Sequence, residues 1–368
     1  MATYFLIAGE ASGDRHAAEL IKQIRVQDPQ AQYIGLGGDQ MVTAGCHLYQ
    51  HIRHMAFMGY AAVLRNVGQI RRNFRIAEEA LLTEQPDVLI LIDYPSFNLR
   101  MAQFCRKHLP HTKIYYYIPP KVWAWKKRRI HRIARLCDEV LGIFPFEPAF
   151  YARYGYRCTY VGHPTVEEIS RIQKTDRFTD RIQTIVLLPG SRKTEIKHCL
   201  PKMLAAARRF PDYRIVVSAA PGIEDSFYAP YLRDGERLTR DTYTAVQQAV
   251  AAIVNSGTAT LETALLACPQ VAVYHLACAR LLGWLRWAQP LVFSIRYFTP
   301  VNIIAGKEII KECLVNDFTV EKVASELERL LTDKAYKKEM LVQYEHLYSL
   351  LGTQSASVTA AQIITSRP

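Results

Sequence analysis

Short apolar runs alternate along the chain with longer amphipathic segments. In the first half, runs rich in β-branched and aromatic residues predict strands at Tyr4–Ala8, Tyr33–Leu36, Val88–Ile92, Lys113–Tyr117 and Val140–Ile143. The segments between them predict helices at His16–Ile24, Val67–Leu82, Leu99–His108 and Arg129–Leu136. Strands that are apolar throughout and separated by helices are typical of βαβ units with a parallel sheet buried on both faces.

The second half repeats this alternation. It predicts strands at Ile185–Leu188, Arg214–Ser218, Ala251–Val254 and Val271–Tyr274, with helices at Leu200–Arg209, Thr242–Gln248 and Ala259–Leu266 between them. Three more helices are predicted near the end, at Ser325–Leu331, Asp333–Leu350 and Ser355–Ile364. We therefore predict α/β domains at 1–164 and 184–316, a linker at 165–183 and C-terminal helices at 317–368.

Two doubly wound domains in series also predict where ligands bind. Such sheets bind ligands beyond the carboxyl ends of their strands, where the strand order reverses. Two of them facing each other form a cleft with one substrate on each wall. The loops that follow the strands are therefore the places to search for chemistry.

Composition narrows the choice of partners. Of 368 residues, 49% are hydrophobic and 22% charged, which is typical of a globular protein, and the net charge of +12 favours an anionic partner. The eight cysteines are scattered without a Cys-x-x-Cys pair, which predicts reduced thiols in a cytoplasmic protein. The start has no signal-peptide pattern, and charged residues interrupt the longest apolar region, 271–295. We expect a protein that lies on a membrane surface if it meets one.

Two loops of the first domain carry candidate chemistry. Ala8-Gly-Glu-Ala-Ser-Gly-Asp14 follows the first strand and opens a helix, so its amides are suited to an anionic ligand. Ser12 or Asp14 alternatively caps that helix. Asp93 follows the strand Val88–Ile92, where its carboxylate can act as a general base toward a sugar hydroxyl. Its alternative role is to cap the next helix.

Two loops of the second domain suit a nucleotide diphosphate. Arg192 stands at a predicted helix start, where a cation opposes the helix dipole, and a bound diphosphate would resolve that conflict. The turn Ser256-Gly-Thr-Ala-Thr-Leu-Glu262 follows a strand and offers amides and hydroxyls to phosphate oxygens. Within it, Gly257, Thr258 and Thr260 belong to the proposed phosphate site and Glu262 is suited to ribose hydroxyls, whereas Ser256 or Thr258 alternatively caps the helix.

Metal chemistry is not predicted. The sequence has no Asp-x-Asp motif, no metal-ligand spacing of His, Cys or Asp, and no P-loop. We therefore expect a transfer without metal or other cofactor, in which Arg192 and a helix dipole stabilise the departing diphosphate.

Taken together, these loops resemble the lipid-A-disaccharide synthases over nearly the whole chain. Further matching segments are Gly35–Gly38, Phe57–Gly59, Asp93–Asn98, Val122–Trp125, Pro145–Glu147, Val161–Pro164, Leu188–Arg192 and Asn302–Glu308. The resemblance implies the GT-B fold, in which two Rossmann-like doubly wound domains face each other across a cleft. It also implies inverting transfer from UDP-2,3-diacylglucosamine to 2,3-diacylglucosamine 1-phosphate, giving UDP and the β-1,6-linked disaccharide of lipid A.

The resemblance assigns roles to individual residues. It implies that Asp93 deprotonates the acceptor 6-hydroxyl and that Arg192 lies in the UDP site with the turn at 256–262. On the acceptor wall it implies Glu10, Ser12, Asp14 and Asn98, and near the donor sugar Asn302 and Glu308. The last helices resemble a family segment that can exchange between subunits, which adds a homodimer to the expectations.

A segment of the first domain is suited to an anionic bilayer. Between Met55 and Arg75, apolar and arginine positions form an amphipathic pattern that includes Met58, Val63, Leu64, Arg65, Val67, Ile70, Arg71 and Arg72. Most amphipathic helices pack on their own core, which is the alternative here. The lipid substrates favour peripheral association with the cytoplasmic face of the inner membrane, and the tryptophans and cations of 123–129 extend that surface or form a solvated basic turn.

Other functions make distinguishable predictions. A UDP-N-acetylglucosamine 2-epimerase of the same fold needs no lipid-facing basic helix and acts on its substrate without detergent. A nucleic-acid-binding protein is disfavoured, because the cations are dispersed and no recognised module is present. A membrane-surface protein without catalytic activity would not need Asp93.

Overall fold

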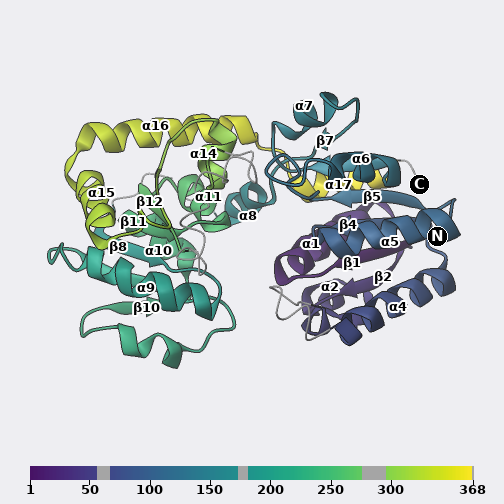
Figure 1. The fold of residues 1–368 in the computed structure, drawn as a ribbon, viewed down its shortest axis with the longest axis horizontal. Coiled ribbons are helices and arrows are strands. Elements are labelled where there is room, and N and C mark those ends of the chain that lie inside the picture. The colour runs from purple at the N-terminus through teal and green to yellow at the C-terminus, as the bar shows by residue number, and fades with distance from the viewer. Residues whose placement is uncertain (56–66, 173–180, 276–295, 367–368) are drawn as a thin grey trace. The chain divides into compact units, whose positions relative to one another are not determined.

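The computed structural model describes residues 1–55, 67–172, 181–275 and 296–366 (Figure 1). The chain divides into two compact units, Met1–Pro164 with Thr353–Pro368, and Thr165–Gly352. The segment 317–368, which the sequence predicted as one group of C-terminal helices, is thus shared between the units. Of the predicted linker, the described residues 165–172 form part of a helix, and 173–180 lie outside the described residues.

The first unit contains a seven-stranded parallel sheet of order β3-β2-β1-β4-β5-β6-β7. Its strands are β1 (Thr3–Ala8), β2 (Gln32–Gly37), β3 (His47–His51), β4 (Val88–Ile92), β5 (Lys113–Tyr117), β6 (Glu139–Gly142) and β7 (Thr159–Tyr160). Its helices are α1 (Ala11–Gln27), α2 (Asp39–Thr43), α4 (Val67–Glu84), α5 (Pro95–His108), α6 (Arg129–Leu136), α7 (Glu147–Ala152) and α17 (Ala356–Thr365), and the 3₁₀ helix η1 spans Ile52–His54.

The helices of this unit are divided between the two faces of its sheet. The chain moves from β1 to β2 through α1 but in the opposite direction through α4, α5 and α6, so right-handed crossovers place α1 on the face opposite the other three. Helix α5 packs against α4 and α6, whereas α17 packs against α1. The buried alanines and Ile364 of α17 explain why this last helix belongs to the first unit.

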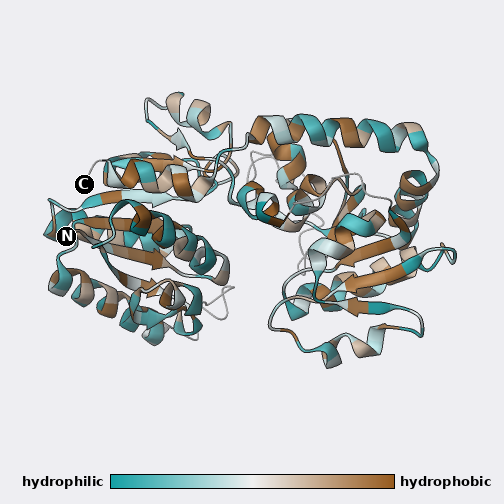
Figure 2. Cartoon of the chain, turned by 180° about the vertical axis from the view of Figure 1, so that it is seen from behind, coloured by the Kyte–Doolittle hydropathy of each residue, from teal (hydrophilic) through white to brown (hydrophobic). Residues whose placement is uncertain are grey.

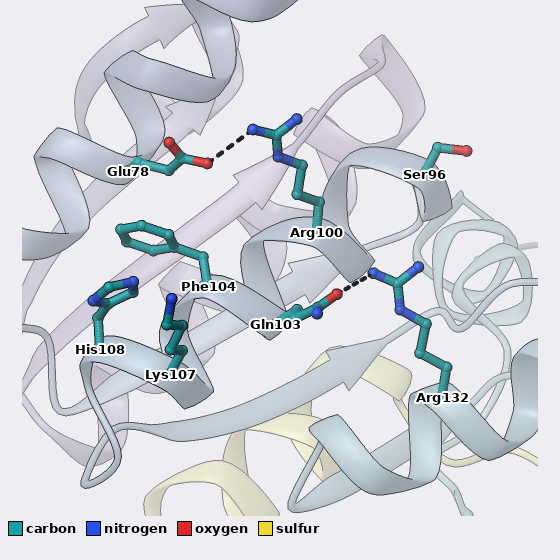
Figure 3. A pocket seen from close by; sticks show the side chains of 8 residues that line it. All are labelled: Glu78, Ser96, Arg100, Gln103, Phe104, Lys107, His108 and Arg132. Carbon is teal, nitrogen blue, oxygen red and sulfur yellow. Dashed lines mark hydrogen bonds and ion pairs between the residues drawn. The ribbon is translucent and has the colours of Figure 1, made fainter.

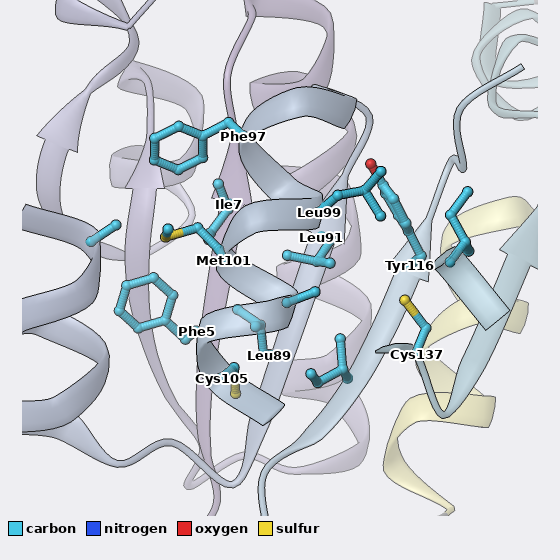
Figure 4. Packing of buried hydrophobic residues seen from close by; sticks show 14 of the residues in the cluster. Phe5, Ile7, Leu89, Leu91, Phe97, Leu99, Met101, Cys105, Tyr116 and Cys137 are labelled. Carbon is cyan, nitrogen blue, oxygen red and sulfur yellow. The ribbon is translucent and has the colours of Figure 1, made fainter. Parts of the chain in front are cut away.

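Between α5 and the sheet, both the helix and the strands contribute apolar side chains to the core. Figure 4 shows the sheet-facing side of this helix, where Phe97, Leu99, Met101 and Cys105 pack with Phe5, Ile7, Leu89, Leu91, Tyr116 and Cys137. All of these side chains are buried. Because β4 is buried along its whole length, its carboxyl end carries the chain from the core to the surface at Asp93.

The second unit contains a six-stranded parallel sheet of order β10-β9-β8-β11-β12-β13. Its strands are β8 (Ile182–Leu188), β9 (Arg214–Ser218), β10 (Arg237–Thr239), β11 (Ala249–Asn255), β12 (Gln270–Tyr274) and β13 (Lys311–Leu314). Its helices are α8 (Pro164–Ile172), α9 (Lys193–Ala207), α10 (Thr242–Gln248), α11 (Thr258–Leu265), α14 (Pro300–Ala305), α15 (Val320–Thr332) and α16 (Lys334–Leu351), with 3₁₀ helices η2 (Asp225–Phe227) and η3 (Ala229–Tyr231).

Hydropathy follows this architecture. Figure 2 shows mostly hydrophobic strands within each unit and helices on which hydrophilic and hydrophobic residues alternate. No described helix combines the length and apolar character that a membrane span requires. The seven described cysteines are free and buried, and Cys278 lies outside the described residues.

A buried histidine beside the sheet makes the stability of the fold depend on pH. His163 is 3% exposed. Burial, together with the charges of His16 and Lys121, lowers its pKa to about 3. The folded state therefore keeps His163 neutral, while the unfolded chain takes up a proton near its ordinary pKa of 6.5. This group lowers the free energy of unfolding as pH falls below 6.5, by up to about 1.4 kcal/mol per pH unit.

We predict that His163→Gln weakens this acid destabilisation. Urea unfolding between neutral pH and about 5 measures the free energy of unfolding of both proteins. Glu147 acts in the opposite direction, because burial raises its pKa to about 7. The difference between variant and wild type is therefore the informative quantity. If the free energies of unfolding of variant and wild type differ by the same amount at every pH in this range, His163 is not a cause of the acid destabilisation.

Candidate functional site

Two loops meet where the strand order of the first sheet reverses. Strands β1 and β4 are parallel neighbours, with Ala8 beside Ile92 at their carboxyl ends. The loops that follow them begin at Gly9 and Asp93. Doubly wound sheets bind their ligands at this point. Asp93 therefore lies at a strand end, as the sequence predicted, and at the topological position of a ligand site.

The backbone at Asp93 is held in an uncommon conformation. Asp93 and Tyr94 have φ angles of 45° and 43°, in the left-handed region that side-chain-bearing residues rarely adopt. The Asn98 side-chain amide donates to the carbonyls of Ile92 (3.1 Å) and Asp93 (2.7 Å). The Tyr116 hydroxyl donates to the same Asp93 carbonyl at 2.7 Å. These bonds fix the loop, so Asn98, predicted on the acceptor wall, is a fully buried support of Asp93.

Tyr94 connects this loop to its neighbours. A Cβ atom added at Gly9 would lie 2.2 Å from the Tyr94 ring, so the close approach of that ring requires glycine. The Tyr94 hydroxyl donates to the carbonyl of Met55 at 2.8 Å. The two loops at the strand reversal are therefore packed directly against each other.

The carboxyl of Asp93 opens into a small pocket. The pocket has a volume of about 280 Å³, and its lining includes Lys121, Trp125, Arg129 and Phe144. These residues come from the segments that follow β5 and β6. The lining combines one carboxylate, two cations and two aromatic rings, which suits a polar ligand with an anionic group.

The pKa of the Asp93 carboxyl is raised above its ordinary value. The main cause is the protein around the carboxyl, which disfavours its charged form, while the Lys121 ammonium and a backbone hydrogen bond from Tyr94 act in the opposite direction. A carboxylate of raised pKa is a stronger base than an ordinary aspartate. The direction of this shift favours a role as proton acceptor.

The three polar residues of the first loop differ in position. Asp14 is 3% exposed, and its carboxylate accepts from the backbone amides of Gly38 (2.7 Å), Gln40 (3.1 Å) and Met41 (3.1 Å). This carboxylate caps α2 rather than α1, so both oxygens are used within the protein. Ser12 is exposed and Glu10 is partly exposed at the start of α1. Glu10 lies near Tyr94 and contributes to the raised pKa of that phenol.

Glu147 is a buried residue whose importance the sequence analysis did not recognise. It has no exposed surface, and burial raises its pKa to about 7. Its carboxylate accepts from the amides of Ile143 (2.9 Å) and Phe144 (3.0 Å) and from the Trp123 indole (3.1 Å). It thereby joins two segments that line the pocket. The motif Pro145-Phe-Glu147 was the only signal for it.

In the second unit, the strand order reverses between β8 and β11. The loop after β8 brings Arg192 to the start of α9, with its guanidinium 3.1 Å from the Glu195 carboxylate. Glu195 also accepts from the Ser191 amide at 3.0 Å. The sequence predicted that an anionic ligand balances the Arg192 cation at this helix start, and Glu195 in the first helical turn supplies part of that balance. Arg192 remains exposed.

The turn after β11 lies beside that loop. Ser256 and Gly257 are partly exposed and Thr258 is exposed at the start of α11, so they are accessible to a ligand. Thr260 is buried, and its hydroxyl donates to the Gly257 carbonyl at 2.8 Å. Glu262 is partly exposed one turn into α11. Thr260 thus supports the turn from within.

Asn302 and Glu308, both predicted near the donor sugar, differ in their exposure to solvent. Asn302 is fully buried; its side chain accepts from the amides of Ile309 (2.7 Å) and Ile310 (3.1 Å) and donates to Glu312 (3.0 Å). It holds the loop that carries Glu308. Glu308 itself is exposed and lies 3.2 Å from the Lys311 ammonium.

Part of the predicted membrane-facing segment is described. Met58, Val63, Leu64 and Arg65 lie outside the described residues, as does the side chain of Val67. On α4, Ile70 is partly exposed and Arg71 and Arg72 are exposed.

The neighbouring surface of α5 has a hollow of about 520 Å³. Figure 3 shows it between α4, α5 and α6, with Arg100 directed toward Glu78 and Arg132 toward Gln103. Lys107 and His108 complete its basic character.

Within the described ranges, no group of three His, Cys, Asp or Glu side chains is placed to hold a metal ion. The polar groups at the two strand reversals are instead a carboxylate, arginines, lysine and small hydroxyl residues. Such groups can accept a proton and bind phosphate oxygens.

Comparisons with known proteins agree with this arrangement. A family model described as lipid-A-disaccharide synthetase matches residues 4–365. The lipid-A-disaccharide synthase of Myxococcus xanthus is 34% identical over 378 residues, covering 98% of this chain and 96% of the relative. That of Trichlorobacter lovleyi is 35% identical over 376 residues, with 98% and 96% covered.

Solved structures show the fold at much lower identity. The glycosyltransferase of kitacinnamycin matches with a TM-score of 0.64 at 11% identity, covering 99% of this chain and 98% of that one. The calicheamicin glycosyltransferase CalG4 matches with a TM-score of 0.61 at 12% identity, covering 100% and 98%. A UDP-GlcNAc 2-epimerase from Neisseria meningitidis, bound to UDP-GlcNAc, matches with a TM-score of 0.58 at 10% identity, covering 99% and 98%. The predicted α/β class with two Rossmann-like sheets of the GT-B type is confirmed.

Proposed function

Because the chain belongs to the lipid-A-disaccharide synthase family, we propose that it joins UDP-2,3-diacylglucosamine to 2,3-diacylglucosamine 1-phosphate. The products are UDP and the β-1,6-linked disaccharide 1-phosphate. The chain is a hexosyltransferase, as its curated relatives are. The observation that carries the catalytic part of this proposal is the position of Asp93 at the strand reversal of the first sheet, where its backbone is held by hydrogen bonds to its carbonyl.

In the proposed reaction, the Asp93 carboxylate takes the proton of the acceptor 6-hydroxyl. The hydroxyl oxygen then forms a bond to C1 of the donor sugar while the bond from C1 to the diphosphate oxygen breaks. The electron pair of that bond leaves with UDP, and attack from the opposite side inverts C1. The raised pKa of Asp93 supports the role of base. The hydrogen bonds to its carbonyl hold the backbone from which the carboxyl projects.

We assign UDP to the strand reversal of the second sheet. The accessible turn Ser256–Gly257–Thr258 offers amides and hydroxyls at the start of α11. Arg192, from the neighbouring loop, is assigned to the diphosphate and Glu262 to the ribose. Thr260 and Asn302 support these loops through their buried hydrogen bonds, and Glu308 is the exposed residue of its loop assigned to the donor sugar.

Arg192→Ala tests this assignment. Hydrogen bonds to charged groups contribute about 1.5–3 kcal/mol, so we expect the Kd for UDP to rise roughly 10- to 100-fold. Calorimetric titration with UDP measures it. Lys197→Ala removes an exposed cation from the same helix and serves as the control. Equal UDP affinity in wild type and Arg192→Ala would remove Arg192 from the diphosphate site.

On the acceptor side, we assign the accessible Glu10 and Ser12 to the sugar. Asp14 and Asn98 act through the backbone that they hold. Homodimer formation stays a prediction from the family resemblance.

We further propose peripheral association with the cytoplasmic face of the inner membrane. Residues 94–137 contain eleven Lys and Arg residues and no Asp or Glu. This stretch includes α5 and α6, and α5 packs between α6 and the arginine-bearing α4. A basic stretch of this kind suits anionic headgroups. Binding to vesicles with and without anionic phospholipid, at two salt concentrations, tests this surface.

The transfer itself is tested by UDP release. We expect release only when both diacylated substrates are present, because the acceptor hydroxyl is the nucleophile. An epimerase would instead act on UDP-N-acetylglucosamine alone and retain the nucleotide on the sugar. Turnover of that compound without acceptor would overturn the proposed function.

A further inference from the structure

We propose that Lys121 and Arg129, together with the face of Trp125, form the subsite for the phosphomonoester on the anomeric carbon of the acceptor sugar. This inference rests on the proposed function and deepens it, because it assigns the group that distinguishes the acceptor from an ordinary diacylglucosamine. All three residues line the pocket into which Asp93 opens.

The two cations of this pocket are available to a ligand. Within the described part of the chain, neither Lys121 nor Arg129 is paired with a carboxylate; their recorded contacts are with the aromatic rings of Phe144 (5.7 Å) and Trp125 (5.9 Å). Arg100 on α5, by contrast, is paired with Glu78 at 3.3 Å. The pocket therefore holds two cations and the single carboxyl of Asp93, an excess of positive charge that favours an anionic ligand.

Lys121 also faces the catalytic carboxyl. Its ammonium is the charge that opposes the rise in the pKa of Asp93. It acts in the same way on Glu147 and lowers the pKa of His163, so it lies at the centre of the titratable groups at this edge of the sheet. A phosphate held by Lys121 would therefore belong to the same sugar whose hydroxyl Asp93 contacts.

The backbone that carries these residues is stiff. Ile118 has a φ angle of 59°, which a β-branched residue seldom adopts, and Pro119 and Pro120 follow it. Lys126, next to Trp125, also has a positive φ of 54°. Such strain gathers at ligand sites, where a fixed geometry lowers the cost of binding. The conformation of the backbone that leads into Lys121 is thus restricted before the ligand arrives.

The chemistry of the acceptor matches this arrangement. In a pyranose, C1 and C5 both adjoin the ring oxygen, so the phosphate on C1 and the hydroxyl on C6 lie along the same edge of the ring. A phosphomonoester carries about −1.5 to −2 charges at neutral pH, which two cations can balance. Trp125 is 43% exposed, and its flat face suits the C–H groups of a sugar ring. One monosaccharide phosphate can therefore contact Asp93 and both cations together.

A phosphate can also come from an anionic phospholipid headgroup, because Lys121, Trp125 and Arg129 belong to the basic stretch 94–137 that we propose for the membrane surface. We assign the acceptor phosphate, since the cations share a concave pocket with Asp93 rather than a flat surface. The test is therefore made in neutral detergent micelles, with a parallel arm that contains anionic phospholipid.

The experiment measures kcat/KM for acceptors with and without the 1-phosphate. Wild type is compared with Lys121→Gln/Arg129→Gln and with the control Arg153→Gln/Arg157→Gln, which removes two exposed cations outside the pocket. We expect wild type and control to prefer the phosphorylated acceptor, and the pocket variant to lose roughly tenfold or more of that preference for each cation. Any change in the pKa of Asp93 affects both acceptors equally and cancels in the ratio.

Each outcome decides the question. An undiminished preference in the pocket variant overturns the inference, and so does a loss seen only in the arm with anionic phospholipid. If wild type forms no disaccharide, the proposed function fails, and binding of glucosamine 1-phosphate against glucosamine still tests the subsite. In that titration, wild type should bind glucosamine 1-phosphate more tightly than glucosamine, and the pocket variant should lose this difference in affinity. Equal affinity of wild type for the two compounds would overturn the subsite.

Discussion

Asp93→Asn is expected to lower kcat for disaccharide formation about 10²- to 10⁴-fold, which is the usual contribution of a general base. The amide keeps the size of the side chain and removes its capacity to accept the proton. Because Asn98 and Tyr116 hold the Asp93 backbone through its carbonyl, they are unaffected by this change. We therefore expect an unchanged free energy of unfolding and an unchanged Kd for UDP.

Ser96→Ala, a change at an exposed position in the first turn of α5, is the matched control and should keep the rate. In wild type, kcat/KM should fall as pH decreases through the raised pKa of Asp93, because only the carboxylate is a base. Near wild-type turnover of Asp93→Asn would exclude the proposed role.

Asn98→Ala is expected to damage both the fold and the reaction. The change removes two hydrogen bonds and leaves the buried carbonyl of Ile92 without its side-chain donor. We expect the free energy of unfolding to fall by about 2–4 kcal/mol, as for other buried polar groups that lose their partner. The left-handed turn at Asp93 then loses a main support, so kcat should also fall. Denaturant unfolding and steady-state kinetics measure these two effects.

Tyr116→Phe is a milder change for comparison with Asn98→Ala. It removes one hydrogen bond to the Asp93 carbonyl and preserves the ring in the core, so a loss of about 1 kcal/mol is expected. If Asn98 instead contacts the acceptor, as the family resemblance implied, Asn98→Ala would raise the acceptor KM and leave stability unchanged.

The sequence predicted the central strands of both sheets and missed their edges. Strands β3, β7, β10 and β13 were not predicted, and each lies at an edge of its sheet. An edge strand has one neighbour and a partly exposed surface, so it does not require a continuous apolar run. The three residues of β10 begin with an exposed arginine, which illustrates the weakness of the signal. The order of the central strands determines where the candidate sites lie. Hydrophobic periodicity predicts the strands themselves but not which of them are neighbours in the sheet.

Some of the candidate residues could likewise be predicted from the sequence, and others could not. Asp93 could be placed from its own sequence, because a polar residue directly follows a buried strand. The supporting role of Asn98 could not, since it depends on bonds to backbone carbonyls rather than on residue type. Glu195, three residues after Arg192, could have been recognised as a partner from helix periodicity. Lys121 and Glu147 come together only because β5 and β6 are neighbours.

The structure of the reaction product tests the central claim most directly. The protein is mixed with UDP-2,3-diacylglucosamine and 2,3-diacylglucosamine 1-phosphate, and the lipid product is analysed by mass spectrometry and by NMR of its anomeric proton. We expect one disaccharide 1-phosphate with a β linkage to the 6-hydroxyl, formed in equal amount with UDP. Release of UDP without a linked disaccharide, or a linkage through another hydroxyl, would contradict the account.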